Sequence, residues 1–440
     1  MGEMIQIGGA QTPVSVQRTA PPAWFEDGGR FWVENEKGDW VSLTESQFGK
    51  HLMMCGFKPA TRADRDNGLM SPIDIELMNT VKDRRVAYAG PLAGWPRGVV
   101  WFDDNAALVT RSPKLLETEK GDCSLIHALV IGLLDKDGLD QSEYLLGWWA
   151  HGLRAYYAGR PTKGMCLALA GEAGCGKTLL KDLIRETFGG RECNPYQWML
   201  GRDSFNRELC EAVVWTIDDE AASTKGEDRI ALGASIKQTV ANSGIRFRGL
   251  HQQAITLNPL RRLIICVNTE PDRILVLPPL DDDIIDKLMI IKAFKGEFPM
   301  PVGTEDEKRA FWDALMNQLP AFVHYLLHEH EIAPAMTGRF GVVHFCHPDI
   351  REQLWEVSPE VQLWEFLERT VLKMTGQWSG TSTELRNWMC GDSSELGIHE
   401  RREVPKPAWL GKRLAKLMRK HPDRVVKSRR GDEYIWEIQR

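Results

Sequence analysis

Short strands are predicted along the first hundred residues, where apolar and polar positions alternate. Aromatic and polar residues alternate from residue 24 around the turn-forming segment 36–39 and then take helical spacing up to residue 57, which predicts a β-hairpin followed by a helix. A second β-rich portion is expected over 86–111, where Gly and Pro separate short apolar runs. These segments predict a small β-rich or α+β domain over residues 1–115. The aromatic residues Trp24, Phe31, Trp32 and Trp40 have the chemistry to stack on bases, but strand aromatics more often form a core.

Helical spacing dominates two later parts of the chain. Residues 124–157 hold two amphipathic segments, which we expect to form a helical collar over 116–160. Residues 305–332 and 358–374 have the same spacing and predict a helical lid and connector over 301–374.

Three apolar runs, 165–170, 213–217 and 263–267, are each followed by polar residues. Continuous apolar runs of this length are typical of buried strands in a parallel sheet, and such sheets bind ligands at the carboxyl ends of their strands. We therefore expect an α/β core with a parallel sheet over residues 161–300.

The last segment, 375–440, has helical spacing that gives way to two strands, 425–430 and 431–438. Helices followed by a hairpin predict a winged-helix-like domain, with residues 410–420 as its recognition helix.

Composition indicates a soluble protein of two or three domains. No apolar run approaches the roughly 18 residues of a membrane helix, and the first residues lack the layout of a signal peptide, so we expect a cytoplasmic protein without a membrane partner. The nine Cys include no C-x-x-C pair, which argues for reduced thiols.

The net charge of −6 hides an asymmetry, because residues 401–440 hold 13 Lys or Arg against 5 Asp or Glu, a local charge of +8. This basic tail points to a nucleic-acid partner.

A glycine-rich turn joins the first apolar run to a helix-like segment. Residues 171–178 fit G-x-x-x-x-G-K-T, in which backbone N–H groups form a concave phosphate site at the positive end of the next helix. Lys177 is expected to contact the β- and γ-phosphates of ATP, and the Thr178 hydroxyl to bind Mg²⁺. The expected nucleotide-binding residues are Gly171, Gly174, Cys175, Gly176, Lys177, Thr178 and Leu179.

Acidic and amide side chains follow the other two apolar runs. Asp219 is assigned to Mg²⁺ and Glu220 to activation of the attacking water, with Asp218 as the competing metal ligand because the register is open by one residue. Asn268 ends the third run and is expected to orient water and to sense the γ-phosphate. With Lys177, these four residues are the catalytic candidates.

Cationic residues lie on the insertion between the second and third runs and on the tail. Residues 245–250 and 254–258 predict a hairpin whose donors suit the phosphates of a single strand, although a solvated hairpin would carry the same residues. The alternative for the tail is a basic helix that serves solubility or subunit contact. The DNA-binding candidates are Lys237, Arg246, Arg248 and His251 of the insertion, and Lys412, Arg413, Lys416, Lys427, Arg429 and Arg430 of the tail.

Four segments in this order resemble the motifs of a known family. GEAGCGKT at 171–178, VVWTIDDE at 213–220, IKQTVANSGIRFRGLHQQ at 236–253 and LIICVN at 263–268 are similar to motifs A, B, B-prime and C of superfamily 3 helicases. The likeness is to the helicase part of phage, plasmid and poxvirus-type primase-helicases. It implies a P-loop, AAA+-type ATPase that forms hexameric rings around single-stranded DNA. It also implies that the hairpin with Arg248 and His251 faces the pore and that Lys237 lies near DNA or a neighbour's nucleotide.

The chain departs from this pattern after the fourth motif. Relatives commonly carry paired arginines on the next helix, one of which reaches the neighbour's ATP, whereas Asp286 and Lys287 occupy the corresponding stretch here. A lysine lacks the planar bidentate fork of arginine, so slow hydrolysis is compatible with this sequence. The candidates for a trans-acting finger are Arg273, Lys287, Arg261 and Arg262.

These observations favour an ATP-dependent DNA helicase or translocase that acts as a homo-oligomeric ring in the replication of a phage, plasmid or other mobile element. Both single-stranded and duplex DNA are expected partners. Residues before 160 show no triad of metal-binding acids, so any primase or polymerase is expected on a separate chain. The alternative is an ATP-controlled, origin-binding initiator or loader without processive unwinding. A small-molecule P-loop kinase would leave the hairpin and the basic tail unexplained.

Overall fold

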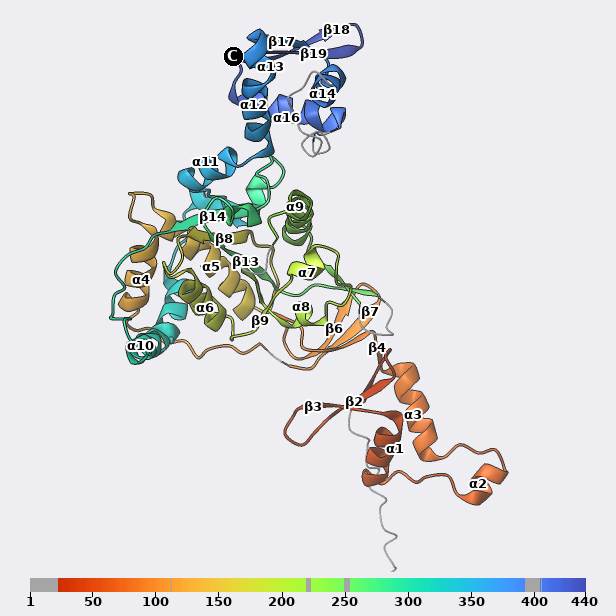
Figure 1. Ribbon diagram of the computed structural model, residues 1–440. Helices are drawn as coiled ribbons and strands as arrows, with labels where there is room; N and C mark the ends of the chain where they lie inside the picture. Colours follow the sequence, from red (N-terminus) through yellow and green to blue (C-terminus); the bar gives the residue numbers. More distant parts are fainter. Residues whose placement is uncertain (1–22, 112, 219–222, 249–253, 392–403, 405) are drawn as a thin grey trace, which may run out of the picture.

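The computed structural model describes residues 23–111, 113–218, 223–248, 254–391, 404 and 406–440 (Figure 1). A small α+β unit lies at its N-terminal end, with a sheet of order β3-β2-β1-β4 in which only β4 runs parallel to its neighbour. Its elements are β1 (Ala23–Glu26), β2 (Arg30–Glu34), β3 (Trp40–Leu43), α1 (Glu45–Met54), α2 (Arg62–Asp66), α3 (Pro72–Asp83) and β4 (Arg85–Val86).

The hairpin and helix predicted in this unit are confirmed. β2 and β3 pair across residues 36–39, and α1 follows behind a capping box at Thr44. Phe31 is buried against α1, while Trp24, Trp32 and Trp40 are partly buried against a second, smaller cluster of apolar residues. These aromatic side chains therefore belong to the packing of the unit.

A second small sheet has the order β5-β7-β6, formed by β5 (Tyr88–Gly90), β6 (Gly98–Phe102) and β7 (Asn105–Val109). The predicted hairpin of the insertion is also present, as β11 (Ile245–Phe247) paired antiparallel with β12 (Ile255–Leu257). Phe247, Ile255 and Leu257 of this hairpin share one hydrophobic cluster with Tyr88 and Val109. One face of the hairpin is therefore packed on this sheet.

The central sheet is parallel throughout, as the three apolar runs predicted. Its order is β14-β8-β13-β10-β9, formed by β8 (Cys166–Gly171), β9 (Glu192–Cys193), β10 (Val214–Asp218), β13 (Arg262–Asn268) and β14 (Leu288–Ala293). β13 lies between β8 and β10, so the strand that ends at Asn268 separates the strand of the glycine-rich turn from the strand of the acids. The protein is thus of the mixed α/β class.

Helices flank this sheet (Figure 1). The two helices expected over 124–157 are present, and their buried side chains share one hydrophobic cluster with the sheet. The indole N–H of Trp148 donates to the carbonyl of Met165, which holds α5 (Gln141–Tyr157) at the start of β8. These two helices are therefore a layer of the sheet's own core. The elements are α4 (Ser124–Leu134), α5 (Gln141–Tyr157), α6 (Lys177–Thr187), α7 (Tyr196–Met199), α8 (Arg207–Glu211), α9 (Gly226–Ala241), the 3-10 turns Ile274–Val276, Ile285–Lys287 and Pro334–Met336, α10 (Glu305–His324) with the π-helical turn Tyr325–Glu329, β15 (Thr337–Gly338) and β16 (Gly341–Val342).

The C-terminal part is a separate unit at the other end of the molecule (Figure 1). Its antiparallel sheet has the order β17-β19-β18, and its buried residues form a cluster of their own. The helix predicted over 358–374 is broken at Thr370, whose hydroxyl donates to the carbonyl of Phe366. Its elements are α12 (Pro359–Arg369), α13 (Val371–Thr375), β17 (Gln377–Gly380), α14 (Ser382–Cys390), α16 (Pro407–Lys420), β18 (Val425–Arg430) and β19 (Glu433–Gln439). The preceding helix, α11 (Pro348–Glu356), packs on the central sheet, because Ile350 and Leu354 belong to that cluster.

Among the described residues, no helix combines the length and the apolar character that crossing a membrane requires.

Candidate functional site

The turn between β8 and α6 has a backbone that glycine alone adopts easily. Gly174 and Gly176 have φ values of +72° and +107°. At Gly171 an added Cβ would lie 2.4 Å from the carbonyl oxygen of Ala293, so the strand end has no room for a side chain. Gly176 is also the N-cap of α6 and provides no capping side chain. The first N–H groups of α6 are therefore suited to an anion such as phosphate.

The ammonium group of Lys177 is held by oxygen atoms at the end of the sheet. It donates to the carbonyls of Gly171 and Glu172 and to Oδ1 of Asn268, each at 2.8 Å. The side chains of Lys177 and Asn268 meet because the β8–β13 register places Asn268 beside Gly171. The structure thus brings together two of the predicted catalytic residues.

The predicted carboxylates follow β10, one strand further along. Asp218 is exposed at the end of that strand, and its charge acts on Lys181 of α6. Burial opposes the charge of Lys181, but Asp182, Glu192 and Asp218 outweigh burial and raise its pKa. Asp219 and Glu220 lie outside the described residues, so their assignment to Mg²⁺ and water stays a prediction.

The remaining residues of the glycine-rich turn differ in their access to a ligand. Thr178 is exposed in the first turn of α6, and Leu179 is partly buried. The side chain of Cys175 is buried in the core, and its N–H already donates to the carbonyl of Glu172. A lysine and the first N–H groups of a helix can donate to the phosphates of ATP, and a threonine hydroxyl oxygen can ligate Mg²⁺, so the described residues fit this ligand.

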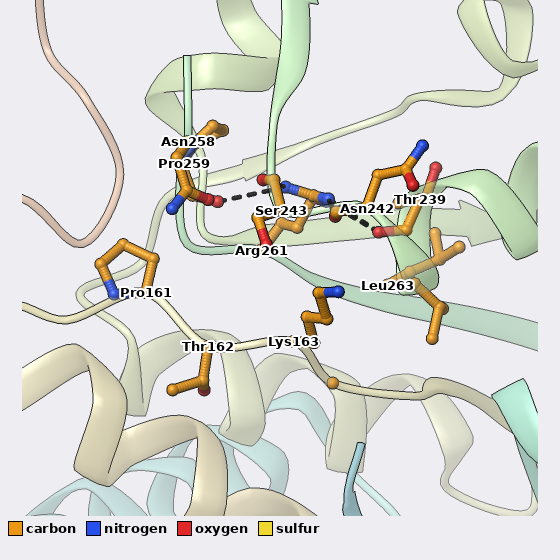
Figure 2. A pocket seen from close by; sticks show the side chains of 12 residues that line it. Pro161, Thr162, Lys163, Thr239, Asn242, Ser243, Asn258, Pro259, Arg261 and Leu263 are labelled. Atoms are coloured by element: carbon orange, nitrogen blue, oxygen red, sulfur yellow. Dashed lines mark hydrogen bonds between the residues drawn. The ribbon is translucent and has the colours of Figure 1, made fainter. Parts of the chain in front are cut away.

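Arg261 and Arg262 are buried, and this corrects the expectation that either reaches a neighbouring subunit. Figure 2 shows Arg261 beside a small cavity, where its guanidinium donates to the carbonyls of Thr239, Asn242, Ser243 and Pro259. Arg262 donates to the carbonyl of Thr162 at 3.0 Å and lies 3.3 Å from Nδ1 of His151. Burial lowers the pKa of both guanidinium groups. Their donors stabilise their own chain, because buried charges need such partners.

The other two finger candidates differ in exposure. Lys287 is mostly buried and donates to Oδ1 of Asp286 at 2.6 Å and to the carbonyl of Asp283. Arg273 is exposed at the start of the turn Ile274–Val276, and its guanidinium forms no ion pair with any described residue. Arg273 is therefore the candidate that remains available to an external anion.

The described DNA-binding candidates of the insertion lie at β11 and on α9. Arg246 and Arg248 are exposed on and beside β11, where the backbone is fixed by hydrogen bonds to the side chain of Asn206. Lys237 of α9 forms an ion pair with Asp283 at 2.6 Å. His251 lies outside the described residues.

The DNA-binding candidates of the tail lie on α16 and on β18 of the C-terminal hairpin. On α16, Lys412 is exposed above the Trp409 ring, Arg413 is partly buried, and Lys416 pairs with Asp281 and Glu360. Lys427, Arg429 and Arg430 are exposed on β18. The hairpin cations are thus open to solvent, whereas Lys416 already has acidic partners.

Three consecutive acids that pair with cations of α16 and α9 were not identified from the sequence. Asp281, Asp282 and Asp283 precede the turn Ile285–Lys287, and each forms an ion pair with a basic residue of another element. The run of three acids was visible in the sequence, but its partners lie up to 137 positions away. Only the folded chain identifies them.

Comparison with known proteins gives one family match and a set of structural likenesses. Residues 169–283 match the model of a family of unknown function (DUF5906), a span that runs from β8 to Asp283 and includes Lys177 and Asn268. No curated protein sequence is detectably similar to the chain.

The fold is similar to that of the NrS-1 C-terminal region. The A-form apo structure of this region has a TM-score of 0.53 at 12% identity, covering 95% of this chain and 96% of that one. The apo structure of its residues 305–718 has the same TM-score and identity and covers 95% of both chains. At this identity the likeness concerns the fold, and it extends over nearly the full length of both chains.

Proposed function

We propose that the protein is an ATP-dependent DNA helicase or translocase of the superfamily 3, AAA+ type. The observation that carries the proposal is the contact between Lys177 and Asn268 at the end of a parallel sheet, directly beside a glycine-rich turn that opens a helix. Convergence of strand ends on one ligand is the arrangement by which open parallel sheets bind nucleotides.

The described residues have distinct parts in nucleotide binding and hydrolysis. The N–H groups at the start of α6 bind phosphate oxygens, and the ammonium of Lys177 neutralises charge that builds on the β- and γ-phosphates. The Thr178 hydroxyl and a carboxylate after β10 hold Mg²⁺, which when bound stabilises the same phosphate charge. Asn268 accepts a hydrogen bond from Lys177 through Oδ1, and we assign to the same amide the orientation of the attacking water. Arg273 is the proposed finger to a neighbouring ATP.

DNA contacts are proposed at two places. The exposed Arg246 and Arg248 on the hairpin suit the phosphates of a single strand, and the cations of β18 suit a duplex. The order of β17, α14, α16, β18 and β19 supports a winged-helix-like reading of the C-terminal unit. Assembly into a homo-oligomeric ring, and a separate primase or polymerase as partner, complete the proposal.

The second candidate is an ATP-controlled initiator or loader that binds duplex DNA without unwinding it. One observation favours it. Arg261, Arg262 and Lys287 donate hydrogen bonds to groups of their own chain, which is compatible with slow hydrolysis.

A forked DNA duplex with a labelled strand separates the two candidates. The helicase proposal predicts ATP-dependent strand displacement that is lost in Lys177→Ala and retained in Lys163→Ala, which removes an exposed lysine just before β8. Sequence-specific duplex binding without displacement would instead support the initiator.

A further inference from the structure

The three consecutive acids Asp281, Asp282 and Asp283 form an acidic turn that binds the basic surface of two helices. Oδ1 of Asp281 lies 2.6 Å from Nζ of Lys416, and Oδ2 of Asp282 lies 2.8 Å from Nη1 of Arg419, both on α16. Oδ2 of Asp283 lies 2.6 Å from Nζ of Lys237 on α9. Every acid of the turn therefore neutralises one cation.

The α16 residues in this contact lie on the face of the helix that points away from its own core. Leu410, Leu414 and Leu417 are fully buried within the C-terminal unit. Arg419 lies opposite these leucines, and Lys416, three positions before it, lies at the edge of the same face, where Glu360 of its own unit also contacts it. This is the face with which a helix of a winged-helix-like domain would enter a DNA groove, and here it is occupied by the acidic turn.

The contact between the two units is one that can open. The buried residues of the C-terminal unit and of the sheet form separate hydrophobic clusters, so among the described residues no continuous core joins α16 to the acidic turn. A cavity of about 460 Å³ lies beside the contact, lined among others by Leu280, Trp355, Glu360 and Lys420.

The ion pairs themselves are weak enough to exchange. The side chains of Arg419 and Asp282 are 68% and 87% exposed, and those of Lys416 and Asp281 are 38% and 47% exposed. Exposed pairs of this kind each change an equilibrium constant by at most about fivefold. Lys416 is held more firmly from within its own unit, because Glu360 is buried and lies 3.2 Å from its ammonium.

We propose that the acidic turn Asp281–Asp283 acts as an internal substitute for DNA phosphates, so that docking of α16 on the turn and binding of duplex DNA by α16 exclude each other. The inference rests on the proposed DNA-binding function. Carboxylate oxygens and phosphate oxygens compete for the same ammonium and guanidinium donors. Duplex DNA thereby releases the C-terminal unit from a turn that lies 13 positions after Asn268 in the chain.

Zero-length carbodiimide cross-linking of the unmodified protein tests the docked contact. We expect an amide cross-link between Asp281 and Lys416 that is lost when duplex DNA is added at saturation. The exposed pair Lys120–Glu329, with a distance of 3.2 Å in another part of the molecule, serves as the internal control and should be unaffected by DNA. An Asp281–Lys416 cross-link that persists at saturation would overturn the inference.

Duplex affinity of the variant Asp281→Asn/Asp282→Asn provides the second test. Removing both carboxylates should tighten duplex binding by about 2- to 20-fold, because the docked state no longer competes. The variant Glu36→Gln/Glu331→Gln removes the same charge at exposed sites and should bind as the wild type does. Equal affinity of the two variants overturns the inference alone, whereas absence of duplex binding in all three proteins overturns the DNA-binding proposal with it.

Discussion

Nζ of Lys177 lies 2.8 Å from Oδ1 of Asn268, although 91 positions separate the two residues in the chain. One residue opens the helix after the first strand of the central sheet, and the other ends the neighbouring strand. The parallel register of β8 and β13 is what brings them together. Any change that shifts this register would separate the ammonium group from its acceptor.

Replacement of Asn268 by Ala is expected to slow ATP hydrolysis by roughly 10- to 100-fold, because Lys177 loses one of its three oxygen partners and the attacking water loses an amide. Steady-state phosphate release measures the effect. Asn67→Ala, at an exposed helix end, is the matched control. Hydrolysis at the wild-type rate in Asn268→Ala would remove this residue from the mechanism.

Gly171→Ala is expected to lower the free energy of unfolding by about 1–3 kcal/mol, because its Cβ would lie 2.4 Å from the carbonyl oxygen of Ala293 on the neighbouring strand. The contrasting variant is Gly132→Ala within α4, where an added Cβ meets nothing within 4 Å. That change should stabilise the protein slightly, since Ala favours a helix. Thermal unfolding midpoints that move in the same direction for both variants would contradict the packing argument.

His151 makes stability depend on pH in the mildly acidic range. Burial and the charges of Arg262 and Arg154 lower its pKa from 6.5 to about 4. The unfolded chain therefore binds a proton between these values while the folded chain does not, so stability falls as the pH drops from about 6.5 towards 4. The expected loss is about 2 kcal/mol at pH 5.

The comparison with His151→Gln isolates this effect from other titrating groups. Glutamine keeps an acceptor for the Arg262 guanidinium but does not titrate. The difference between wild-type and variant unfolding midpoints should change between pH 7 and pH 5. A constant difference would show that His151 does not titrate on unfolding.

Replacing Arg246 and Arg248 of the hairpin by Ala should weaken single-stranded DNA binding. Loss of two phosphate contacts should reduce the slope of log affinity against log salt by up to about 1.4. Lys308→Ala/Arg309→Ala removes two exposed cations from α10 and is the control. An unchanged slope in the hairpin variant would place the DNA strand elsewhere.

Most elements near the site could be predicted from local patterns. The apolar runs over 165–170, 213–217 and 263–267 gave β8, β10 and β13, because continuous apolar stretches of strand length have few other solutions in a soluble protein. The hairpin of β11 and β12 followed from alternation on both sides of a turn. The meeting of Lys177 and Asn268 followed from the rule that parallel strands end at one edge.

The burial and the partners of individual charged side chains could not be predicted in this way. Arg261 and Arg262 stand beside a buried strand in the sequence, but only the fold reveals that backbone carbonyls surround them. The partners of Asp281 and Asp282 lie in a different unit, so no local pattern indicates them. Amphipathic spacing predicts that one face of α4 and one face of α5 are buried, but it does not identify the central sheet as their partner.

The central claim is that Lys177 belongs to an ATP-hydrolysing site coupled to DNA. Steady-state ATP hydrolysis, measured with and without single-stranded DNA, tests it most directly in the wild type, Lys177→Ala and Lys163→Ala. The account predicts turnover that DNA stimulates in the wild type and in Lys163→Ala, and that falls by at least about 100-fold in Lys177→Ala. Turnover in Lys177→Ala equal to that of the wild type would contradict the account.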